Sequence, residues 1–310
     1  MAAEDYPRTL LELETRFSTE AQCRAYLFAL RWPEGFVCPQ CHGGRVWQMS
    51  RGLWLCGDCR PQASVTAGTI FQDTRTPLPL WFRAIWQVTS QKHGATALGV
   101  MRVLGLGSYK TAWAWLHKLR RAMVRPGRDG LSGAVEVDEV YVGGEKPGRR
   151  GRGAAGKALG LILAQADGAR IGRIRLVRVA DASAASLTAA VTQSVVPGSQ
   201  ILTDGWSGYV GLAAKGYHHA VVREQAIVGA NLLPRANRVA ALLQRWLLGT
   251  QQGAVAHAYL GYYLDEFTFR FNRRTARSRG LLFYRLLQQA VQIPPHPYAK
   301  LVVPQPVGAG

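Results

Sequence analysis

The sequence lacks any apolar run long enough to cross a lipid bilayer, although hydrophobic residues make up 48% of its 310 positions. Its first residues, MAAEDYPRTLLELETRF, carry acids too early for a secretory signal peptide. No G-x4-G-K-[ST] phosphate loop is present. These absences argue against a membrane protein, an exported protein and a P-loop NTPase, and we expect a cytoplasmic location.

Acidic residues are also scarce. The chain has 19 Asp and Glu against 38 Lys and Arg, which gives a formal net charge of +19. An excess of this size favours nucleic acid as the partner. An anionic membrane surface is the alternative, but the basic residues are spread over several predicted elements instead of along one amphipathic helix. We therefore expect a nucleic-acid partner and no membrane partner.

Cysteine is rare, yet four of the five cysteines stand in pairs. Two C-x2-C knuckles separated by fourteen residues are typical of a zinc ribbon with four cysteine ligands, and four coincidental core cysteines are the alternative. The predicted ligands of one structural Zn²⁺ are Cys38, Cys41, Cys56 and Cys59. The fifth, Cys23, lies on the apolar face of a helix predicted over residues 10–30, and we interpret it as a small buried hydrophobe.

Residues 93–123 break into two helical runs at Gly105–Gly107, and Ser108 is the expected N-cap of the second run. A short helix, a glycine turn and a longer basic helix form a helix-turn-helix pattern. An ordinary helical hairpin with a solvated basic face is the alternative, but the zinc ribbon and the net charge favour DNA binding. The candidate DNA contacts here are Lys110, Lys118, Arg120 and Arg121.

The stretch Ala134–Gly144, AVEVDEVYVGG, reads as a buried strand that carries three acids, Glu136, Asp138 and Glu139. An unpaired buried carboxylate is costly, so we expect a divalent metal to compensate them. Asp204 likewise follows an apolar run and precedes a glycine. Two strand-end aspartates that converge on Mg²⁺ would suit phosphoryl-transfer chemistry on a polyanion. The alternative is an aspartate satisfied by the amides of a turn.

The second half of the chain predicts a mixed α/β sheet, with strands at 161–166, 174–179 and 200–203 and a helix near 182–194. Helices follow at 232–248, 255–274 and 280–291. The glycine-rich loop 145–157 is dense in positive charge and suited to lie along a phosphate backbone. Further candidate DNA contacts are Arg149, Arg150, Arg152, Arg245, Arg273 and Arg274.

Taken in order, CPQC, CGDC, GTIFQDTRTPLPLWF, SYKTAWAWLHKLR, VEVDEVYVGG, TDGWSGY, QRWLLGT and YLDEFTFRFNRR resemble the DDE-type transposases of bacterial insertion sequences that carry an N-terminal zinc ribbon. The resemblance implies a ribonuclease H-like catalytic domain with two catalytic Mg²⁺ or Mn²⁺ ions. It also implies cleavage and joining of double-stranded DNA at transposon terminal inverted repeats and at a target. A nucleoid-associated homodimer or higher homo-oligomer is the expected working form.

Carried over residue by residue, the resemblance places the catalytic ligands at Asp138, Asp204 and Asn237. The family has Glu, Asn or His at the third position and usually a Lys seven residues later, where this chain has Gln244. Gln251 stands where a His is common. Asn can still donate a neutral oxygen to a metal, but Gln cannot supply the positive charge of Lys to a phosphate.

These departures keep other interpretations open. Glu266 is the second choice for the third ligand, with a solvated or Arg-paired helix acid as the alternative. A catalytically impaired or domesticated descendant would bind DNA without cutting it. A zinc-ribbon transcription regulator whose second domain only oligomerises is the third possibility.

The expected fold class is α+β, mixed. We expect an N-terminal helix and zinc ribbon over 1–75 and helix-turn-helix-like DNA-binding helices over 76–127. A ribonuclease H-like mixed α/β catalytic domain with a helical C-terminus is expected over 134–292, and an extended tail over 293–310.

Overall fold

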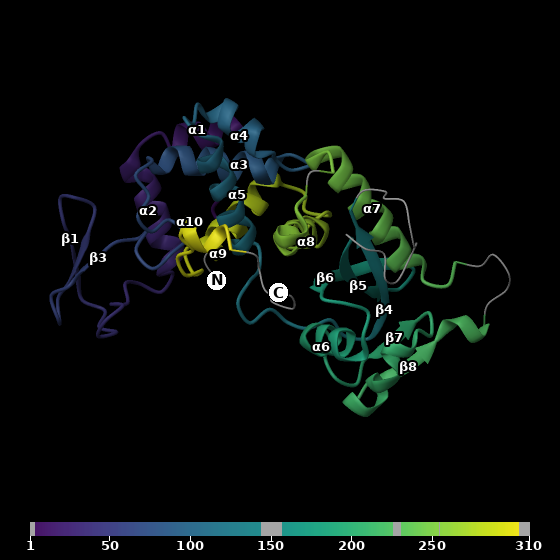
Figure 1. The fold of residues 1–310 in the computed structure, drawn as a ribbon. Coiled ribbons are helices and arrows are strands. Elements are labelled where there is room, and N and C mark those ends of the chain that lie inside the picture. The colour runs from purple at the N-terminus through teal and green to yellow at the C-terminus, as the bar shows by residue number, and fades with distance from the viewer. Residues whose placement is uncertain (1–3, 144–156, 226–230, 254, 304–310) are drawn as a thin grey trace. The chain divides into compact units, whose positions relative to one another are not determined.

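The computed structural model describes residues 4–143, 157–225, 231–253 and 255–303 (Figure 1). Contacts divide the chain into two compact units. Unit 1 comprises residues 1–126 and 276–302, and unit 2 comprises residues 127–275 and 303–310. In the described part of the chain, none of the helices has the length and apolarity needed to cross a lipid bilayer.

Unit 1 consists of helices and one small antiparallel sheet in the order β1-β2-β3. The helices are α1 (Leu10–Arg16), α2 (Glu20–Arg31), α3 (Leu78–Ser90), α4 (Ala97–Leu104), α5 (Tyr109–Ala122), α9 (Arg279–Ala290) and α10 (Tyr298–Leu301). The strands are β1 (Val46–Gln48), β2 (Trp54–Cys56) and β3 (Gln62–Ala63).

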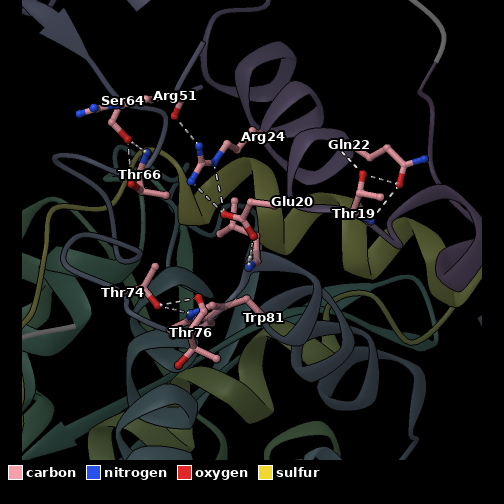
Figure 2. Close-up of polar contacts among 11 residues, drawn as sticks. Thr19, Glu20, Gln22, Arg24, Arg51, Ser64, Thr66, Thr74, Thr76 and Trp81 are labelled. Carbon is pink, nitrogen blue, oxygen red and sulfur yellow. Dashed lines mark hydrogen bonds and ion pairs between the residues drawn. The ribbon is translucent and has the colours of Figure 1, made fainter. Parts of the chain in front are cut away.

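The helix predicted over residues 10–30 is two helices, α1 and α2. A capping box starts α2: the Thr19 side chain accepts a hydrogen bond from the Gln22 amide, and the Gln22 side chain accepts one from the Thr19 amide (Figure 2). The sequence carries this signal, a Thr followed three residues later by Gln, which the 3.6-residue apolar period conceals because it continues across the break.

Helix α3 begins at Leu78 with proline in its first turn, and none of its flanking side chains caps it. The cap comes from α2, where Glu20 Oε2 accepts a 2.8 Å hydrogen bond from the Leu78 amide. Glu20 also pairs with Arg24, one turn further along α2 (Figure 2). Nearby, the Trp81 indole donates a 2.8 Å hydrogen bond to Thr74 Oγ1, which ties α3 to the preceding loop.

The core of unit 1 is aromatic. Trp81 of α3 stacks on Trp115 of α5 with ring centroids 3.8 Å apart, and Phe82 meets both Phe17 and Phe283 edge-on. Phe283 belongs to α9, so this late helix packs on α3 within unit 1. The predicted catalytic domain, 134–292, includes α9, whereas the contacts place α9 in unit 1. The reason is that the apolar face of α9 is buried against the N-terminal helices.

The C-terminal residues also depart from the prediction of an extended tail over 293–310. Residues 298–301 form the helical turn α10, which packs on α5, and the Leu301 side chain is fully buried. Residues 304–310 lie outside the described part of the chain. Ile293 and Leu301 are buried at the two ends of this segment, whereas Pro294 and residues 297–300 between them are exposed.

Unit 2 is built on a five-stranded sheet in the order β6-β5-β4-β7-β8. The strands are β4 (Ala134–Val142), β5 (Ala158–Asp167), β6 (Arg170–Val179), β7 (Gln200–Thr203) and β8 (His218–Val221). Neighbours β4, β5 and β6 are antiparallel, whereas β7 runs parallel to β4 and β8 parallel to β7. The expected mixed α/β sheet is confirmed.

Helices cover both faces of this sheet. They are α6 (Ala184–Ser194), α7 (Pro234–Gln251) and α8 (Leu260–Phe271), with 3-10 segments η1 (Ser207–Lys215), η2 (Val222–Gln225) and η3 (His257–Tyr259). One core contains Val135, Val137, Leu187 and Tyr209, so α6 and η1 lie on that face. The other core contains Val140, Val142, Val239 and Phe267, so α7 and α8 cover the opposite face (Figure 1).

Candidate functional site

The four knuckle cysteines of unit 1 converge on one point. Their Sγ atoms all lie within 4.8 Å of one another. The pairs Cys38–Cys59 and Cys41–Cys56 are each separated by 3.6 Å between sulfurs, and Cys56–Cys59 by 3.7 Å. A tetrahedron with Zn–S bonds of about 2.3 Å has sulfur–sulfur edges of about 3.8 Å, so this donor set fits Zn²⁺.

Backbone amides support the thiolates. The amides of Gln40, Gly43 and Asp58 lie 3.4–3.5 Å from the sulfurs of Cys38, Cys41 and Cys56. The Cys59 amide, and after it the Asp58 amide, lower the pKa of Cys56 to about 6, which favours the thiolate that a metal requires. The neighbouring Cys41 thiol raises the pKa of Cys59 instead. The four-cysteine cluster therefore supports the predicted zinc binding, and a set of four protein sulfurs is the ligand set of a closed, structural site.

In unit 2, Asp138 lies in β4, and Asp204 directly follows β7, the parallel neighbour of β4. The last registered pair of β4 and β7 is Glu136 with Leu202. Each aspartate follows its member of that pair by two residues. If the strand spacing continues one residue past β7, it brings both aspartates to the same level and the same face of the sheet. That face is the one covered by α7, since Val140 of β4 belongs to the α7 core.

The sequence suggested that Asp138 stands at the end of its strand, and the structure shows that it does not. Strand β4 continues to Val142, whereas β7 ends at Thr203, so the middle of the long strand is level with the end of the short one. The half-buried Asp138 carboxylate accepts a 2.8 Å hydrogen bond from the Glu139 amide through Oδ1.

The turn after β7 fixes Asp204. Its Oδ1 accepts a 3.0 Å hydrogen bond from the Trp206 amide. Gly205 has φ +85°, a left-handed conformation that glycine adopts without strain. Thr203 Oγ1 accepts from the Gly205 amide and lies 2.8 Å from His219 Nε2 on β8. His219 therefore supports the turn instead of pointing at a ligand of its own.

Tyr209 of η1 links the acids of this region. Its buried hydroxyl donates a 2.6 Å hydrogen bond to Glu139 Oε1. Burial raises the pKa of Tyr209, and the negative charges of Glu139, Asp138 and Asp204 raise it further. One hydroxyl thus experiences both aspartates, which agrees with their shared level in the sheet. The TDGWSGY motif contains Tyr209, but its contact with Glu139 could not be read from the sequence, because the two residues are 70 positions apart.

Glu136 does not need the metal that we expected to compensate it. Its carboxylate is 2% exposed and accepts three hydrogen bonds from the first turn of α7. Oε2 accepts from the amides of Arg235 (2.7 Å) and Ala236 (2.9 Å), and Oε1 from Arg235 Nη1 (2.8 Å). The expectation of a metal at Glu136 is wrong, since a helix N-terminus and a guanidinium supply the compensating positive charge.

The third predicted ligand, Asn237, is exposed in the first turn of α7. Its Nδ2 donates a 2.6 Å hydrogen bond to Asn231 Oδ1, so its own oxygen is the atom with metal-ligand chemistry. Glu266, the second choice, is 1% exposed and bound to Arg270 at 2.8 Å. It is therefore the Arg-paired helix acid that we gave as the alternative.

Two carboxylates and one amide oxygen form an all-oxygen donor set, which suits Mg²⁺ or Mn²⁺. Across the described ranges, the zinc-ribbon cysteines form the one close group of three or more His, Cys, Asp or Glu ligand atoms. Asp138, Asp204 and Asn237 stay candidate ligands at the sheet.

The predicted DNA contacts of unit 1 differ in exposure. Lys110 is exposed at the start of α5, next to the exposed Tyr109, and Lys118 and Arg121 are partly buried. Arg120 is 2% exposed, so its assignment as a DNA contact does not agree with this structure. Helix α5 is buried around most of its circumference, and its first turn is the part that faces solvent.

In unit 2, the predicted contacts Arg149, Arg150 and Arg152 lie outside the described residues. Arg274 donates to the backbone carbonyls of Ile171, Gly172 and Phe271, and Arg273 lies over the Phe269 ring at 4.0 Å. Arg245 is exposed on α7. The exposed Arg238 was missed, although it stands seven residues before Arg245 and therefore on the same helix stripe.

Family comparison assigns both regions. Residues 18–62 match the transposase zinc-ribbon domain, and residues 130–272 match the ISXO2-like transposase domain. The chain carries two transposase domains. The zinc-ribbon match contains all four knuckle cysteines, and the ISXO2-like match contains Asp138, Asp204 and Asn237.

A curated relative supports the assignment. The chain is 30% identical over 140 residues to an uncharacterized protein in transposable element ISH50 of Halobacterium salinarum. The aligned part spans 44% of this chain and 45% of that relative, or about half the length of each. No solved structure matches the chain. Helices α3, α4, α5 and α9 lie outside both matched transposase domains.

Proposed function

We propose that this chain is a DDE-type transposase that binds the ends of its insertion sequence and catalyses metal-dependent phosphodiester hydrolysis and strand transfer. The observation that carries the proposal is the parallel pairing of β4 with β7, in which Asp138 follows Glu136 and Asp204 follows Leu202 by two residues each. Both lie inside the ISXO2-like match. Two acids brought together from positions far apart in sequence, in a chain of net charge +19, favour chemistry on a nucleic acid.

Asp138, Asp204 and the oxygen of Asn237 would hold two Mg²⁺ or Mn²⁺ ions. Such ions supply charge stabilisation for the in-line displacement of a phosphodiester. The chain contributes the alignment of these three oxygens. Backbone amides already fix Oδ1 of each aspartate, and Asn231 fixes the amide of Asn237.

Double-stranded DNA, both element ends and target, is the proposed partner. The exposed stripe of α7 that carries Asn237 also carries Arg238 and Arg245, which suits a phosphate backbone lying along this helix. Lys110 at the exposed start of α5 would contact DNA from unit 1. A homodimer or higher homo-oligomer acting in the cytoplasm, at the nucleoid, completes the proposal.

The test is cleavage of DNA that carries the sequences flanking the gene, with purified full-length protein and Mn²⁺ or Mg²⁺. We expect strand cleavage at the element ends. Asp138→Asn and Asp204→Asn should each lower the rate by more than about a hundredfold, because even outer-shell partners of metal ligands contribute 10–100-fold.

Asp167→Asn is the matched control, since Asp167 is an exposed aspartate at the far end of β5. It should keep its rate within about twofold of wild type. No cleavage by wild type under any of these conditions would refute the proposed activity. Equal rates for wild type and both aspartate variants would refute the proposed site.

A second candidate is a catalytically impaired descendant that binds the same DNA. The exposed Gln244, two turns beyond Asn237 on α7, favours it, because a neutral amide replaces a cation there. Gln244→Lys should then raise cleavage by about tenfold, the equivalent of about 1.4 kcal/mol, as expected for one added charged hydrogen bond to phosphate. An unchanged rate would argue against this candidate. If Asp138→Asn and Asp204→Asn kept every DNA-dependent property of wild type, neither the active transposase nor the impaired descendant would hold. A zinc-ribbon transcription regulator would then be the better interpretation.

A further inference from the structure

The buried carboxylate of Glu136 joins two elements that are distant in sequence. It lies in β4 between Val135 and Val137, and it is 2% exposed. Its three hydrogen bonds, at 2.7, 2.8 and 2.9 Å, all come from Arg235 and Ala236 in the first turn of α7. Both carboxylate oxygens are therefore occupied by protein donors, so Glu136 is not placed to ligate a metal.

Helix α7 has no cap of its own. Leu233 occupies its N-cap position without a side-chain hydrogen bond, and Pro234 opens the helix. The first amides of a helix need acceptors, and they carry partial positive charge. Glu136 supplies that acceptor from the sheet. The first turn of α7 is therefore held by an acceptor from β4.

Arg235 extends the same contact to a third segment. Its Nη1 binds Glu136, its Nη2 donates a 2.7 Å hydrogen bond to the Gly168 carbonyl, and its Nε donates one of 3.2 Å to the Arg170 carbonyl. Gly168 lies in the turn between β5 and β6, and Arg170 is the first residue of β6. We call this set of contacts the Glu136–Arg235 clamp. It fixes the first turn of α7 to both β4 and the β5–β6 turn.

The clamp stands beside the candidate ligands. Asp138 is two residues after Glu136 and therefore on the same face of the strand. Asn237 directly follows Ala236, whose amide Glu136 binds. The two elements that carry Asp138 and Asn237 are thus joined at points within two residues of each ligand.

We infer that Glu136 is a positioning residue that sets the placement of Asn237 relative to Asp138, and that Arg235 completes its effect. This inference rests on the proposed function, since it concerns how the proposed metal site is assembled. Glu136→Gln is the sharpest change. The glutamine oxygen can still accept the two amide bonds, but its NH2 group would face the guanidinium of Arg235, donor against donor.

The experiment measures Mn²⁺ binding to the zinc-loaded full-length protein by electron paramagnetic resonance, with hydrogen exchange of α7 peptides on the same samples. The matched control is Glu20→Gln, which changes the acid that caps α3 in unit 1. We expect Glu136→Gln to weaken Mn²⁺ binding by about tenfold or more and to speed exchange at Arg235–Asn237. Glu20→Gln should leave Mn²⁺ binding within about twofold of wild type.

A second variant, Arg235→Lys, covers the case in which Glu136→Gln does not fold. Lysine keeps the charge and the backbone amides but loses the fork that reaches Gly168 and Arg170. It should weaken Mn²⁺ binding by about three- to tenfold. Faster exchange at the start of α7 with unchanged Mn²⁺ affinity in either folded variant would overturn the inference.

The failure of the proposed function gives a different result. In that case wild type shows no Mn²⁺ binding that Asp138→Asn abolishes, whatever the exchange of α7. The positioning inference fails together with the site under that result, whereas the faster exchange in Glu136→Gln would still report the clamp itself.

Discussion

Helices α3 and α7 begin in the same way in two different units. Each has proline in its first turn, and none of its flanking side chains caps it. Each is capped instead by a glutamate from a distant element: Glu20, 58 residues before Leu78, and Glu136, 100 residues before Ala236. Proline suits the first turn of a helix, but it has no amide to donate and no side chain to cap.

The two caps differ in burial. The Glu20 side chain is 39% exposed, and that of its partner Arg24 is 36% exposed. Glu20 Oε1 and Arg24 Nη2 are 3.2 Å apart. Glu136 is 2% exposed, with three donors on its two oxygens. Water can reach the carboxylate of Glu20, whereas the carboxylate of Glu136 is closed off from it. A glutamate cap from a distant element therefore contributes less to the stability of the helix start at α3 than at α7.

The largest expected effect is confined to unit 1 and involves neither Glu20 nor Glu136. Removal of zinc by a chelator should unfold β1, β2 and β3, because structural zinc sites contribute about 10–16 kcal/mol of apparent binding free energy. Hydrogen exchange should rise across residues 46–63 and stay unchanged across α7. Zinc release can be followed with a chromogenic chelator. Full protection of the ribbon after complete zinc loss would contradict the closed four-cysteine site.

The next largest effect should be at Glu136. Glu136→Ala leaves a guanidinium and two amides without their acceptor, and breaking a buried pair costs about 3–5 kcal/mol. Arg235 is 23% exposed and keeps its carbonyl partners, so we expect about 3 kcal/mol. The measurement is the opening free energy of α7 amides from hydrogen exchange against urea. A loss below about 1 kcal/mol would mean that burial does not distinguish the two caps.

The smallest effect should be at Glu20. Glu20→Ala removes one exposed cap and one exposed ion pair, which together contribute about 0.5–1 kcal/mol. The same exchange measurement on the first turn of α3 gives the value, with α7 as the internal reference. The pairing with Arg24 is screened by salt, so the loss should shrink at about 1 M salt. A cost equal to that of Glu136→Ala would break the comparison.

The sequence was sufficient for features that depend on local spacing. The two C-x2-C knuckles predicted the zinc cluster, and Gly105–Gly107 with Ser108 predicted the break between α4 and α5. Strand 200–203 was predicted with the bounds that β7 has. Each of these signals lies within a few residues of the feature that it determines.

Features that depend on pairing between distant segments were not predictable. The acid pattern around Asp138 was visible, but Glu136 looked the same as its neighbours, and its partners lie about 100 residues away. The burial of Arg120 was hidden for a related reason, since α9 and α10 pack on α5 from the other end of the chain. Charge in a sequence indicates solvent exposure only on average, and late packing decides the individual residue.

The return of α9 to unit 1 has a consequence for synthesis on the ribosome. Phe82 and Trp86 of α3 have Phe283 as a ring partner, and Phe283 is made only after all of residues 127–275. Unit 2 can fold before Phe283, a ring partner of the N-terminal helix α3, has been synthesised. A copy truncated at about residue 275 would keep every candidate metal ligand yet display an open aromatic face, and so be a target for chaperones and proteases.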